Sequence, residues 1–239
     1  MQYPIRINKY LAEEKYSTRV GGDTLIKKGL VFVNGKKAII GQQVYKEDKV
    51  EVRSDKIKKD YVYYAYNKKI NVSTNKEPRS KDILSVTKFP ERVFPVGRLD
   101  KDSHGLIILT NDGRITDRLL SPKYVHEKEY VVKVEPNFTH KFIELMSSGV
   151  RFDKYVSKKC EVWPYKTRTG ESKNIFNIIL TEGKKRQIRR MCEALHHKVI
   201  DLKRIRIMNI NIGSLKDGEY KKIEGKELET FLNLLGLGK

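Results

Sequence analysis

The stretch that decides the fold runs from residue 97 to residue 112 and reads GRLDKDSHGLIILTND. Its second half holds four consecutive apolar residues, 106–109, between Gly105 and the turn-forming run 111–113. A short apolar run bounded by turn residues predicts a buried strand. Asp100 then lies on a turn at the mouth of a sheet, where its carboxylate can meet a substrate. A solvated turn aspartate is the ordinary alternative, because Asp favours turns.

Strand-like and helix-like segments follow one another irregularly from residue 61 onward. Strands are predicted over 61–66, 93–96, 105–110, 128–134, 160–163, 175–181 and 205–212. Helices are predicted near 114–120, 138–147, 184–195 and 225–235. Without regular strand-helix alternation, the pattern favours an α+β fold over a doubly wound parallel sheet.

The first fifty or so residues read as a small unit of their own. A short helix is predicted from the apolar positions between Ile5 and Leu11, and Ser17 or Thr18 is available to cap a second one. Segments 30–33 and 36–40 flank Asn34-Gly35, which predicts a hairpin, and a third strand is expected at 49–53. The next residues are charged and poor in apolar side chains, which is typical of a linker. We therefore divide the chain into a domain at 1–54, a linker at 55–60 and a larger domain at 61–239.

Charge is the dominant feature of the composition. The 239 residues include 50 Lys and Arg against 30 Asp and Glu, for a net charge of +20. A polyanion, and nucleic acid above all, is the natural partner. No stretch approaches the 18 apolar residues of a membrane span, so no membrane is expected as a partner. The first residues lack the apolar core of a signal peptide, so the sequence predicts a cytoplasmic protein.

The cysteine and histidine content argues against a metal. Cys160 and Cys192 are too few for a disulfide framework, and no Cys/His spacing is typical of a zinc site. His104, His196 and His197 have no partner that the sequence identifies, and we interpret them as RNA-facing or structural.

Three segments of the larger domain are candidates for chemistry: the one with Asp100, HEKEYVVKV with Tyr130, and EGKKRQIRRMCEAL with Arg189. Tyr130 shares its side of a strand with Val132 and Val134, so a core tyrosine is an equal alternative. The third segment places apolar residues 188, 191, 192 and 195 on one face of a helix. Nine basic residues against two acidic ones between 183 and 206 favour a phosphate-tracking surface over a solvated mixed-charge face.

These three segments, in this order, resemble the motifs of the RsuA-type pseudouridine synthases. The motifs are G-R-L-D followed by G-L-x-x-L-T-N-D-G, then K-x-Y, then G-x-x-R-Q-[IV]-R-R-M, and they match residues 97–100 with 105–113, 128–130 and 183–191. Residues 5–53 resemble an S4 RNA-binding module, the family's usual N-terminal companion. KDSHGL, HEKEY, RQIRRMCE and KRIRIMN resemble most closely the RluF subgroup, which acts on large-subunit ribosomal RNA.

The resemblance implies isomerisation of uridine to pseudouridine, a reaction that consumes no redox cofactor, metal or nucleotide. A monomer is the default expectation for an enzyme that must dock on a large RNA. The resemblance assigns the covalent role to Asp100, a guanidinium beside that carboxylate to Arg189, and stacking on the flipped base to Tyr130. Arg98 would fill the space that the base vacates. The cations expected on RNA are Lys184, Lys185, Arg186 and Arg190, together with Arg19, Lys27 and Lys28 of the N-terminal unit.

The chain departs from the family pattern in two places. Gly21 and Gly22 fall inside a predicted helix, at a cost of about 1 kcal/mol each, so the module is expected to be looser or its RNA contact changed. Where the family has N-K-P-x-G, residues 67–71 read NKKIN, without the proline or the glycine. Two rival functions remain open. One is a non-enzymatic RNA-binding or ribosome-assembly protein, and the other is the same reaction on transfer RNA or small-subunit ribosomal RNA.

Overall fold

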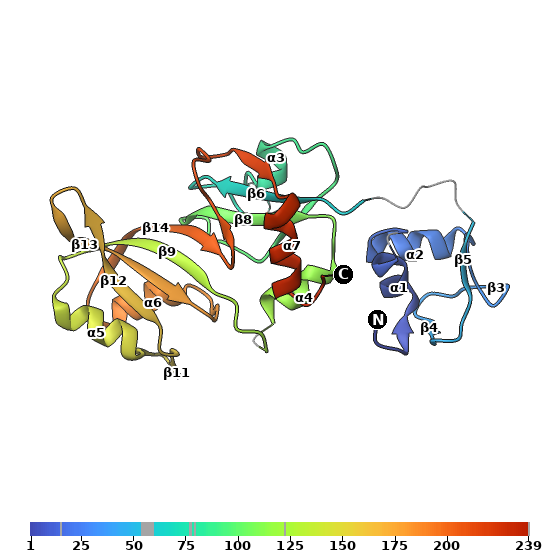
Figure 1. Cartoon of the computed structure of the whole chain (residues 1–239), viewed down its shortest axis with the longest axis horizontal. Helices are drawn as coiled ribbons and strands as arrows, with labels where there is room; N and C mark the ends of the chain where they lie inside the picture. Colours follow the sequence, from blue (N-terminus) through green and yellow to red (C-terminus); the bar gives the residue numbers. More distant parts are fainter. Residues whose placement is uncertain (15, 54–59, 77, 79, 122, 239) are drawn as a thin grey trace.

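The structure is a computed structural model that describes residues 1–238 except 15, 54–59, 77, 79 and 122. The predicted linker therefore lies almost entirely outside the described residues. Two bodies of secondary structure stand on either side of it, the smaller one drawn in blue in Figure 1.

The N-terminal unit contains two helices and two small sheets. Its elements are β1 (Ile5–Arg6), α1 (Ile7–Glu13), α2 (Arg19–Lys27), β2 (Val31–Val33), β3 (Lys36–Lys37), β4 (Gln43–Val44) and β5 (Val50–Val52). Strands β3, β2 and β5 form one antiparallel sheet in that order, and β1 pairs with β4. The predicted hairpin is present, with Asn34 and Gly35 at φ 50° and 78°, but β3 ends at Lys37.

Helix α2 begins where the sequence predicts and tolerates its two glycines. The Thr18 side chain accepts a hydrogen bond from the Gly21 N–H at 3.1 Å. A Cβ at Gly22 would lie 3.3 Å from Asn8 Cα in α1. The glycine thus permits close packing of the two helices, whose apolar faces join the strands in one core around Ile7, Leu11 and Val31.

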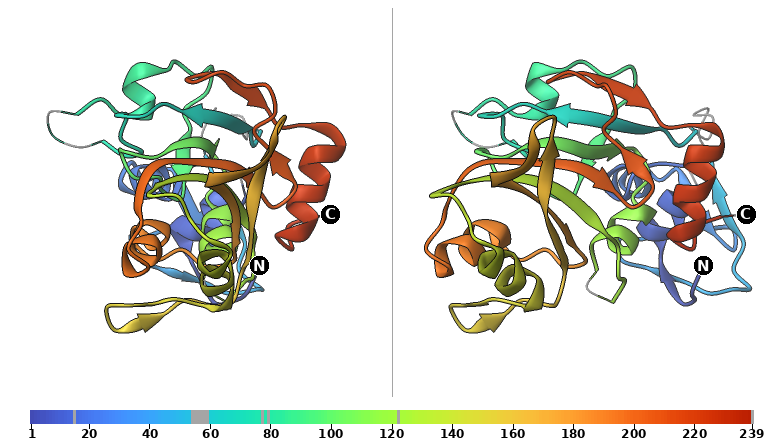
Figure 2. Two further views of the ribbon diagram at one scale, coloured as in Figure 1. Left: turned by 90° about the vertical axis from the view of Figure 1, so that its left-hand side faces the viewer. Right: turned by 60° about the vertical axis from the view of Figure 1, so that its left-hand side comes forward.

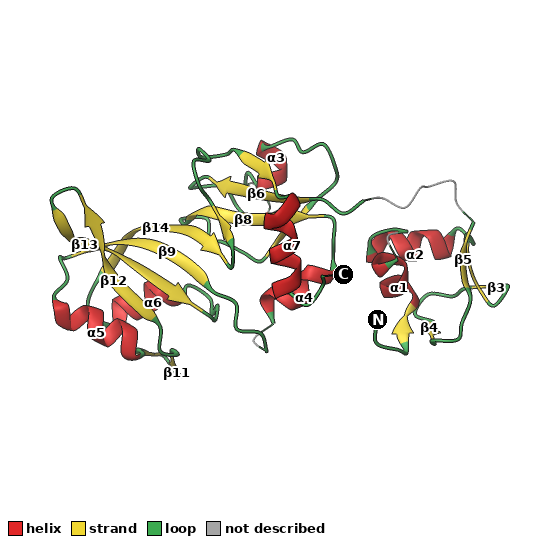
Figure 3. Ribbon diagram, viewed as in Figure 1, coloured by secondary structure: helices red, strands yellow, loops and turns green. Residues whose placement is uncertain are grey.

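The larger part of the chain is built on a nine-stranded mixed sheet (Figure 3). Its strands are β6 (Tyr63–Lys68), β7 (Phe94–Val96), β8 (His104–Thr110), β9 (Lys128–Glu135), β12 (Glu161–Thr167), β13 (Gly170–Leu180), β14 (Lys198–Ile207), β15 (Ile210–Asn211) and β16 (Tyr220–Lys222). The main order is β12-β13-β9-β14-β8-β6-β16, with β7 paired to β8 and β15 paired to β14. Only β14 and β8 are parallel among the described pairs, so the predicted α+β class with a mixed sheet is confirmed.

Helices cover the sheet in separate groups, as Figures 1 and 2 show. They are α3 (Ile83–Val86), α4 (Arg114–Leu120), α5 (His140–Ser148), α6 (Gln187–Ala194) and α7 (Gly225–Leu234), and a small hairpin of β10 (Arg151–Phe152) and β11 (Tyr155–Val156) follows α5. Helices α5 and α6 pack on β9, β13 and β14 around Phe142, Phe176 and Met191. Helices α4 and α7 pack on the β6–β8 half.

Strand β8 is buried on both faces, which explains its unbroken apolar run. Leu106 and Ile108 face the core shared with α4 and α7. Ile107 and Leu109 face a second core with α3 and the β6 tyrosines. The chain segment that leads into β8 is thereby fixed to a deeply buried strand of the sheet.

The C-terminal strand prediction was wrong in its bounds. Strand β14 covers 198–207, and the predicted segment 205–212 is the end of β14, a turn at Met208 with φ 52°, and β15. Arg204 occupies an inward position of β14 with only 4% of its surface exposed, and its Nε donates to the Leu106 carbonyl at 2.7 Å. A buried arginine interrupts the apolar alternation by which a strand is recognised.

Candidate active site

Asp100 lies on the loop between β7 and β8, and a neighbouring loop holds its backbone in place. The Thr74 hydroxyl donates to the Leu99 carbonyl at 2.7 Å and accepts from the Leu99 N–H at 3.0 Å. The Asn71 N–H donates to the Lys101 carbonyl at 2.8 Å. The Asp100 carboxylate projects from this doubly anchored loop and is 34% exposed, so it is presented at the mouth of the sheet.

Asn71 occupies the position at which the family's N-K-P-x-G pattern has glycine. It has φ 64°, a conformation that Gly adopts freely and that Asn tolerates better than most other residues. The asparagine thus adopts, at the position of the pattern's glycine, a left-handed conformation that glycine would also allow. The Lys69 side chain lies along Gly218, where a Cβ would meet its Cε at 2.4 Å.

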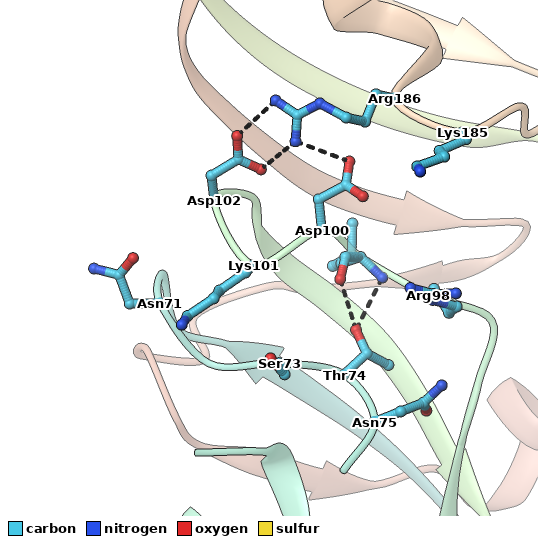
Figure 4. Close-up of a pocket in the computed structure, with 11 residues that line it drawn as sticks. Asn71, Ser73, Thr74, Asn75, Arg98, Asp100, Lys101, Asp102, Lys185 and Arg186 are labelled. Atoms are coloured by element: carbon cyan, nitrogen blue, oxygen red, sulfur yellow. Dashed lines mark hydrogen bonds and ion pairs between the residues drawn. The ribbon is translucent and has the colours of Figure 1, made fainter. Parts of the chain in front are cut away.

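A hollow of about 330 Å³ opens in front of Asp100 (Figure 4). It lies between the two anchored loops and the segment that precedes α6. Its lining residues are Asn71, Ser73, Thr74, Asn75, Arg98, Leu99, Asp100, Lys101, Asp102, Lys185 and Arg186. Predicted residues from two distant segments, 98–100 and 185–186, are thus brought to one site. The loop with Asn71 was noted as a departure from the family pattern, but no site role was predicted for Asn71, Ser73 or Asn75.

Two carboxylates share one guanidinium in this hollow. Arg186 Nη1 and Nη2 donate to the two oxygens of Asp102 at 3.1 and 2.9 Å, and Arg186 Nη1 lies 3.8 Å from Asp100 Oδ2. Partial burial acts to raise the pKa of Asp102, but the hydrogen bond from Arg186 and the positive charge of Arg189 outweigh it and lower that pKa. Asp102 is thus held as an anion beside Asp100.

Arg189 occupies a different place from the one that the resemblance implied. Its Nε lies 3.3 Å from Asp102 Oδ2, and its Nη2 donates to the Asp102 carbonyl at 2.8 Å. Its Nη1 donates to the Val199 carbonyl at 3.1 Å. Among the described residues, the cation within 4.0 Å of the Asp100 carboxylate is Arg186. Arg189, only 12% exposed, ties α6 to the loop that carries Asp100.

Lys68 is a buried cation beneath the site that sequence reasoning missed. It is fully buried, and its Nζ donates to the Lys69 and Val72 carbonyls at 3.0 and 2.7 Å. Burial lowers the pKa of Lys68 to about 8, against the opposing attraction of Asp102 and Asp100. The signal available in the sequence was a lysine at the end of the predicted strand 61–66, which by itself predicts a solvent-facing side chain.

Tyr130 and Arg98 differ in their position relative to the hollow. Arg98 is exposed and lines the hollow. Tyr130 is partly buried on β9, packs against the core of α5 and α6, and is not among the residues that line the hollow. It pairs with Arg204, which pairs with Gly105. Two strand-to-strand spacings therefore separate Tyr130 from Gly105 at the start of β8, a distance of roughly 10 Å.

The cations expected to contact RNA differ in whether they already contact another side chain of the protein. Lys185, Arg19, Lys27 and Lys28 are exposed. Lys184 lies over the Tyr155 ring at 4.7 Å. Arg190 forms an ion pair with Asp153 and stands over Phe152.

One histidine has a partner that the sequence did not reveal. His104 Nε2 lies 3.0 Å from Asp201 Oδ1, a residue of β14. In the described part of the chain, no group of three or more His, Cys, Asp or Glu side chains is placed to hold a metal ion. None of the helices there is long and apolar enough to cross a bilayer.

Comparisons with known proteins place this geometry in context. Residues 43–194 match the family model described as RNA pseudouridylate synthase. The chain is 40% identical over 236 residues to the dual-specificity RNA pseudouridine synthase RluF of Escherichia coli K12, which covers 97% of this chain and 79% of that protein. It is 30% identical to the ribosomal large subunit pseudouridine synthase B of Bacillus subtilis, with 98% of each chain covered.

The fold is also similar to a solved structure. A crystal structure of a pseudouridylate synthase superposes with a TM-score of 0.67 at 25% identity, covering 97% of this chain and 99% of the other. The similarity therefore extends over both bodies of secondary structure.

Proposed function

This chain belongs to the RNA pseudouridylate synthase family and isomerises uridine to pseudouridine in RNA, and we propose that its RNA is large-subunit ribosomal RNA. The proposal rests on the Bacillus subtilis relative, whose name specifies the ribosomal large subunit and whose length is matched almost end to end. The net charge of +20 suits a polyanion of that size.

The reaction exchanges one bond for another within a single nucleotide. The bond between ribose C1′ and uracil N1 breaks, and a bond between C1′ and C5 forms. N1 gains a proton and C5 loses one, so the product is an isomer. No redox partner is consumed, and a carboxylate suffices as the covalent participant. We therefore propose an enzyme that works without a cofactor. We also propose that it acts as a monomer, because it must dock on a large RNA.

Asp100 is proposed as that carboxylate because it is 34% exposed at the mouth of the sheet and lies 3.8 Å from Arg186. Asp102 binds Arg186 and Arg189 more closely. A carboxylate that acts as a nucleophile, or that assists elimination at the ribose, must be ionised. Arg186 Nη1 places a positive charge 3.8 Å from the Asp100 carboxylate. Arg189 positions the loop that carries Asp100, because it binds the Asp102 and Val199 carbonyls.

Entry of the uridine requires that it leave the RNA helix, at a cost of a few kcal/mol. Arg98, exposed beside the hollow, is placed to occupy the position that the base leaves. Tyr130 is proposed to stack on the base, which recovers about 1 to 3 kcal/mol. Tyr130 lies two strands away from β8, at the register position of Gly105.

The N-terminal unit is proposed to act as an S4-type RNA-binding domain, over residues 1–54. Arg19, Lys27 and Lys28 are exposed on α2 and directly after it, as phosphate contacts require. Lys184 and Lys185 extend the basic surface beside the hollow, and we propose that they too contact phosphates.

A second substrate class has a specific observation in its favour. The Escherichia coli relative, at 40% identity, is described as having dual specificity. We infer that transfer RNA is the second class to be tested alongside ribosomal RNA.

Tritium release tests the proposal directly. The parent protein is incubated with ribosomal RNA or transfer RNA that carries 5-tritiated uridine, because C5 loses its hydrogen in the reaction. Asp100→Asn is expected to abolish release while it binds RNA as the parent does. Asp117→Asn, at an exposed position of α4, serves as the matched control and should release tritium normally. Release by Asp100→Asn at the parent's rate would reject the role of Asp100.

A further inference from the structure

A second hollow, of about 350 Å³, adjoins the one in front of Asp100. It lies between the loop after Asn71, helix α3 and strand β7. Its lining residues are Thr74, Asn75, Lys76, Asp82, Leu84, Ser85 and Pro95. Nothing in the pseudouridine chemistry derived above makes use of it.

The two hollows share a wall. Thr74 and Asn75 line both of them. Thr74 is fixed in position by its two hydrogen bonds to Leu99, the residue directly before Asp100. A ligand in the second hollow is therefore separated from a ligand in the first by the shared wall of Thr74 and Asn75, and a single extended molecule can reach both.

The frame of the second hollow is rigid. The Ile83 N–H donates to the Ser73 carbonyl at 3.1 Å, which joins α3 to the loop that carries Thr74. Asp82 caps α3, and its carboxylate accepts from the N–H groups of Leu84 and Ser85 at 3.0 and 3.3 Å. Among the described residues that line this hollow, Asp82 is the carboxylate, and its Oδ1 is already engaged in capping α3.

The remaining surface combines apolar faces with a positive rim. Leu84 is 46% exposed although it is a large apolar side chain, and Pro95 lies opposite it on β7. Lys76 is exposed at the edge. A nucleotide matches this combination. Its planar base can pack against the apolar side chains, and its phosphate can contact the ammonium group of the lysine.

We propose that this hollow is a subsite for the base of a nucleotide adjacent to the target uridine in the same RNA strand. The inference rests on the proposed function. When the uridine leaves the stack, its neighbour loses a stacking partner, and the second hollow offers that neighbour an apolar surface in return. Leu84 and Pro95 are then residues that determine which RNA context is accepted.

The test uses a short stem-loop RNA that carries the mapped uridine, and two matched RNAs in which the nucleotide on its 5′ or 3′ side is abasic. For the parent, one abasic position should lower kcat/KM about fivefold, which corresponds to about 1 kcal/mol. Leu84→Ala should lose a similar factor on the intact RNA and lose nothing further on the abasic one. Val86→Ala, on the same helix and 41% exposed but outside the hollow, should behave as the parent.

The outcomes separate the two levels of the proposal. If Leu84→Ala turns over the intact RNA at the parent's rate, or shows the parent's full abasic penalty, the subsite is rejected while the function stands. If the parent forms no pseudouridine in any RNA, the proposed function itself is rejected.

Discussion

Asp102 organises the site at the scale of single residues, although no motif singled it out. It binds the Arg186 guanidinium through two hydrogen bonds and also holds Arg189. The sequence could predict that Asp100 and the basic segment meet, because both belong to motifs of one family. Which arginine contacts which carboxylate could not be predicted. Arg186 lies directly before α6 at φ 52°, and helical periodicity does not predict where the side chain of such a residue points.

The two arginines should therefore respond differently to substitution. Arg186→Gln is expected to lower kcat at least tenfold without changing stability, because its side chain is exposed and is the one that reaches Asp100. Arg189→Gln is expected to lower kcat and also to destabilise the fold by about 1 to 3 kcal/mol, because the largely buried guanidinium joins α6 to the Asp102 and Val199 carbonyls, which lose their donor. Turnover, RNA affinity and urea unfolding measured on both variants check this. RNA affinity that falls in parallel with kcat in either variant would contradict the assignment.

Lys68 gives stability a pH dependence whose sign follows from its pKa. In the folded protein that pKa is about 8, below the ordinary value of 10.5, so the unfolded chain binds more protons between these limits. Stability contributed through Lys68 then rises as pH increases from 8 to 10. Lys68→Met should remove this rise. Between pH 8 and 10, the free energy of unfolding of the parent should therefore increase by about 2 kcal/mol relative to that of the variant. Urea unfolding at several pH values measures it, and parallel curves would refute it.

At the scale of elements, the contact between β8 and β14 limits what the sequence could reveal. Helix α4 was predicted over 114–120 and is found there, because its apolar spacing is regular and Gly113 precedes it. The first seven residues of β14 were missed because its buried Arg204 resembles a surface residue in a basic run. Tertiary contacts, not local pattern, decide such a strand.

Gly105 is required by the same contact. A Cβ there would lie 2.2 Å from the Arg204 carbonyl oxygen, and its φ is +102°. Gly105→Ala should therefore disrupt the parallel pairing and lower the free energy of unfolding by more than about 3 kcal/mol. Gly113→Ala, where a Cβ meets open space at φ −67°, is the control and should change stability by less than about 1 kcal/mol. Thermal unfolding of both variants provides the measurement.

For the whole molecule, net charge overstates the number of cations available to RNA. Arg206 is held by Glu127 and Glu129 at 3.0 and 2.8 Å, and Arg114 forms a two-bonded pair with the fully buried Asp112. Composition alone could predict a polyanion partner but not which positive charges remain unpaired. That distinction depends on contacts between segments far apart in the chain.

Salt dependence of RNA binding should separate free cations from paired ones. Each phosphate contact contributes close to one unit to the slope of log affinity against log salt. Lys27→Gln with Lys28→Gln should reduce this slope by about 1 to 2, because both side chains are exposed. Lys141→Gln, which removes a cation already paired with Glu144 at 3.1 Å, should leave it unchanged. Equal slopes for all three proteins would reject a role for the N-terminal unit in phosphate binding.

The order of strands in the large sheet also governs when the protein can finish folding. Strand β6 is flanked by β8 and by β16, and β8 in turn meets β14. The chain must therefore be synthesised to about residue 222 before the strand that begins at residue 63 has both neighbours. Until then β6 presents an open edge, which can pair with other chains. Because such long-range pairing is slow, the nascent enzyme depends on the last tenth of its own sequence to complete the sheet around the Asp100 loop.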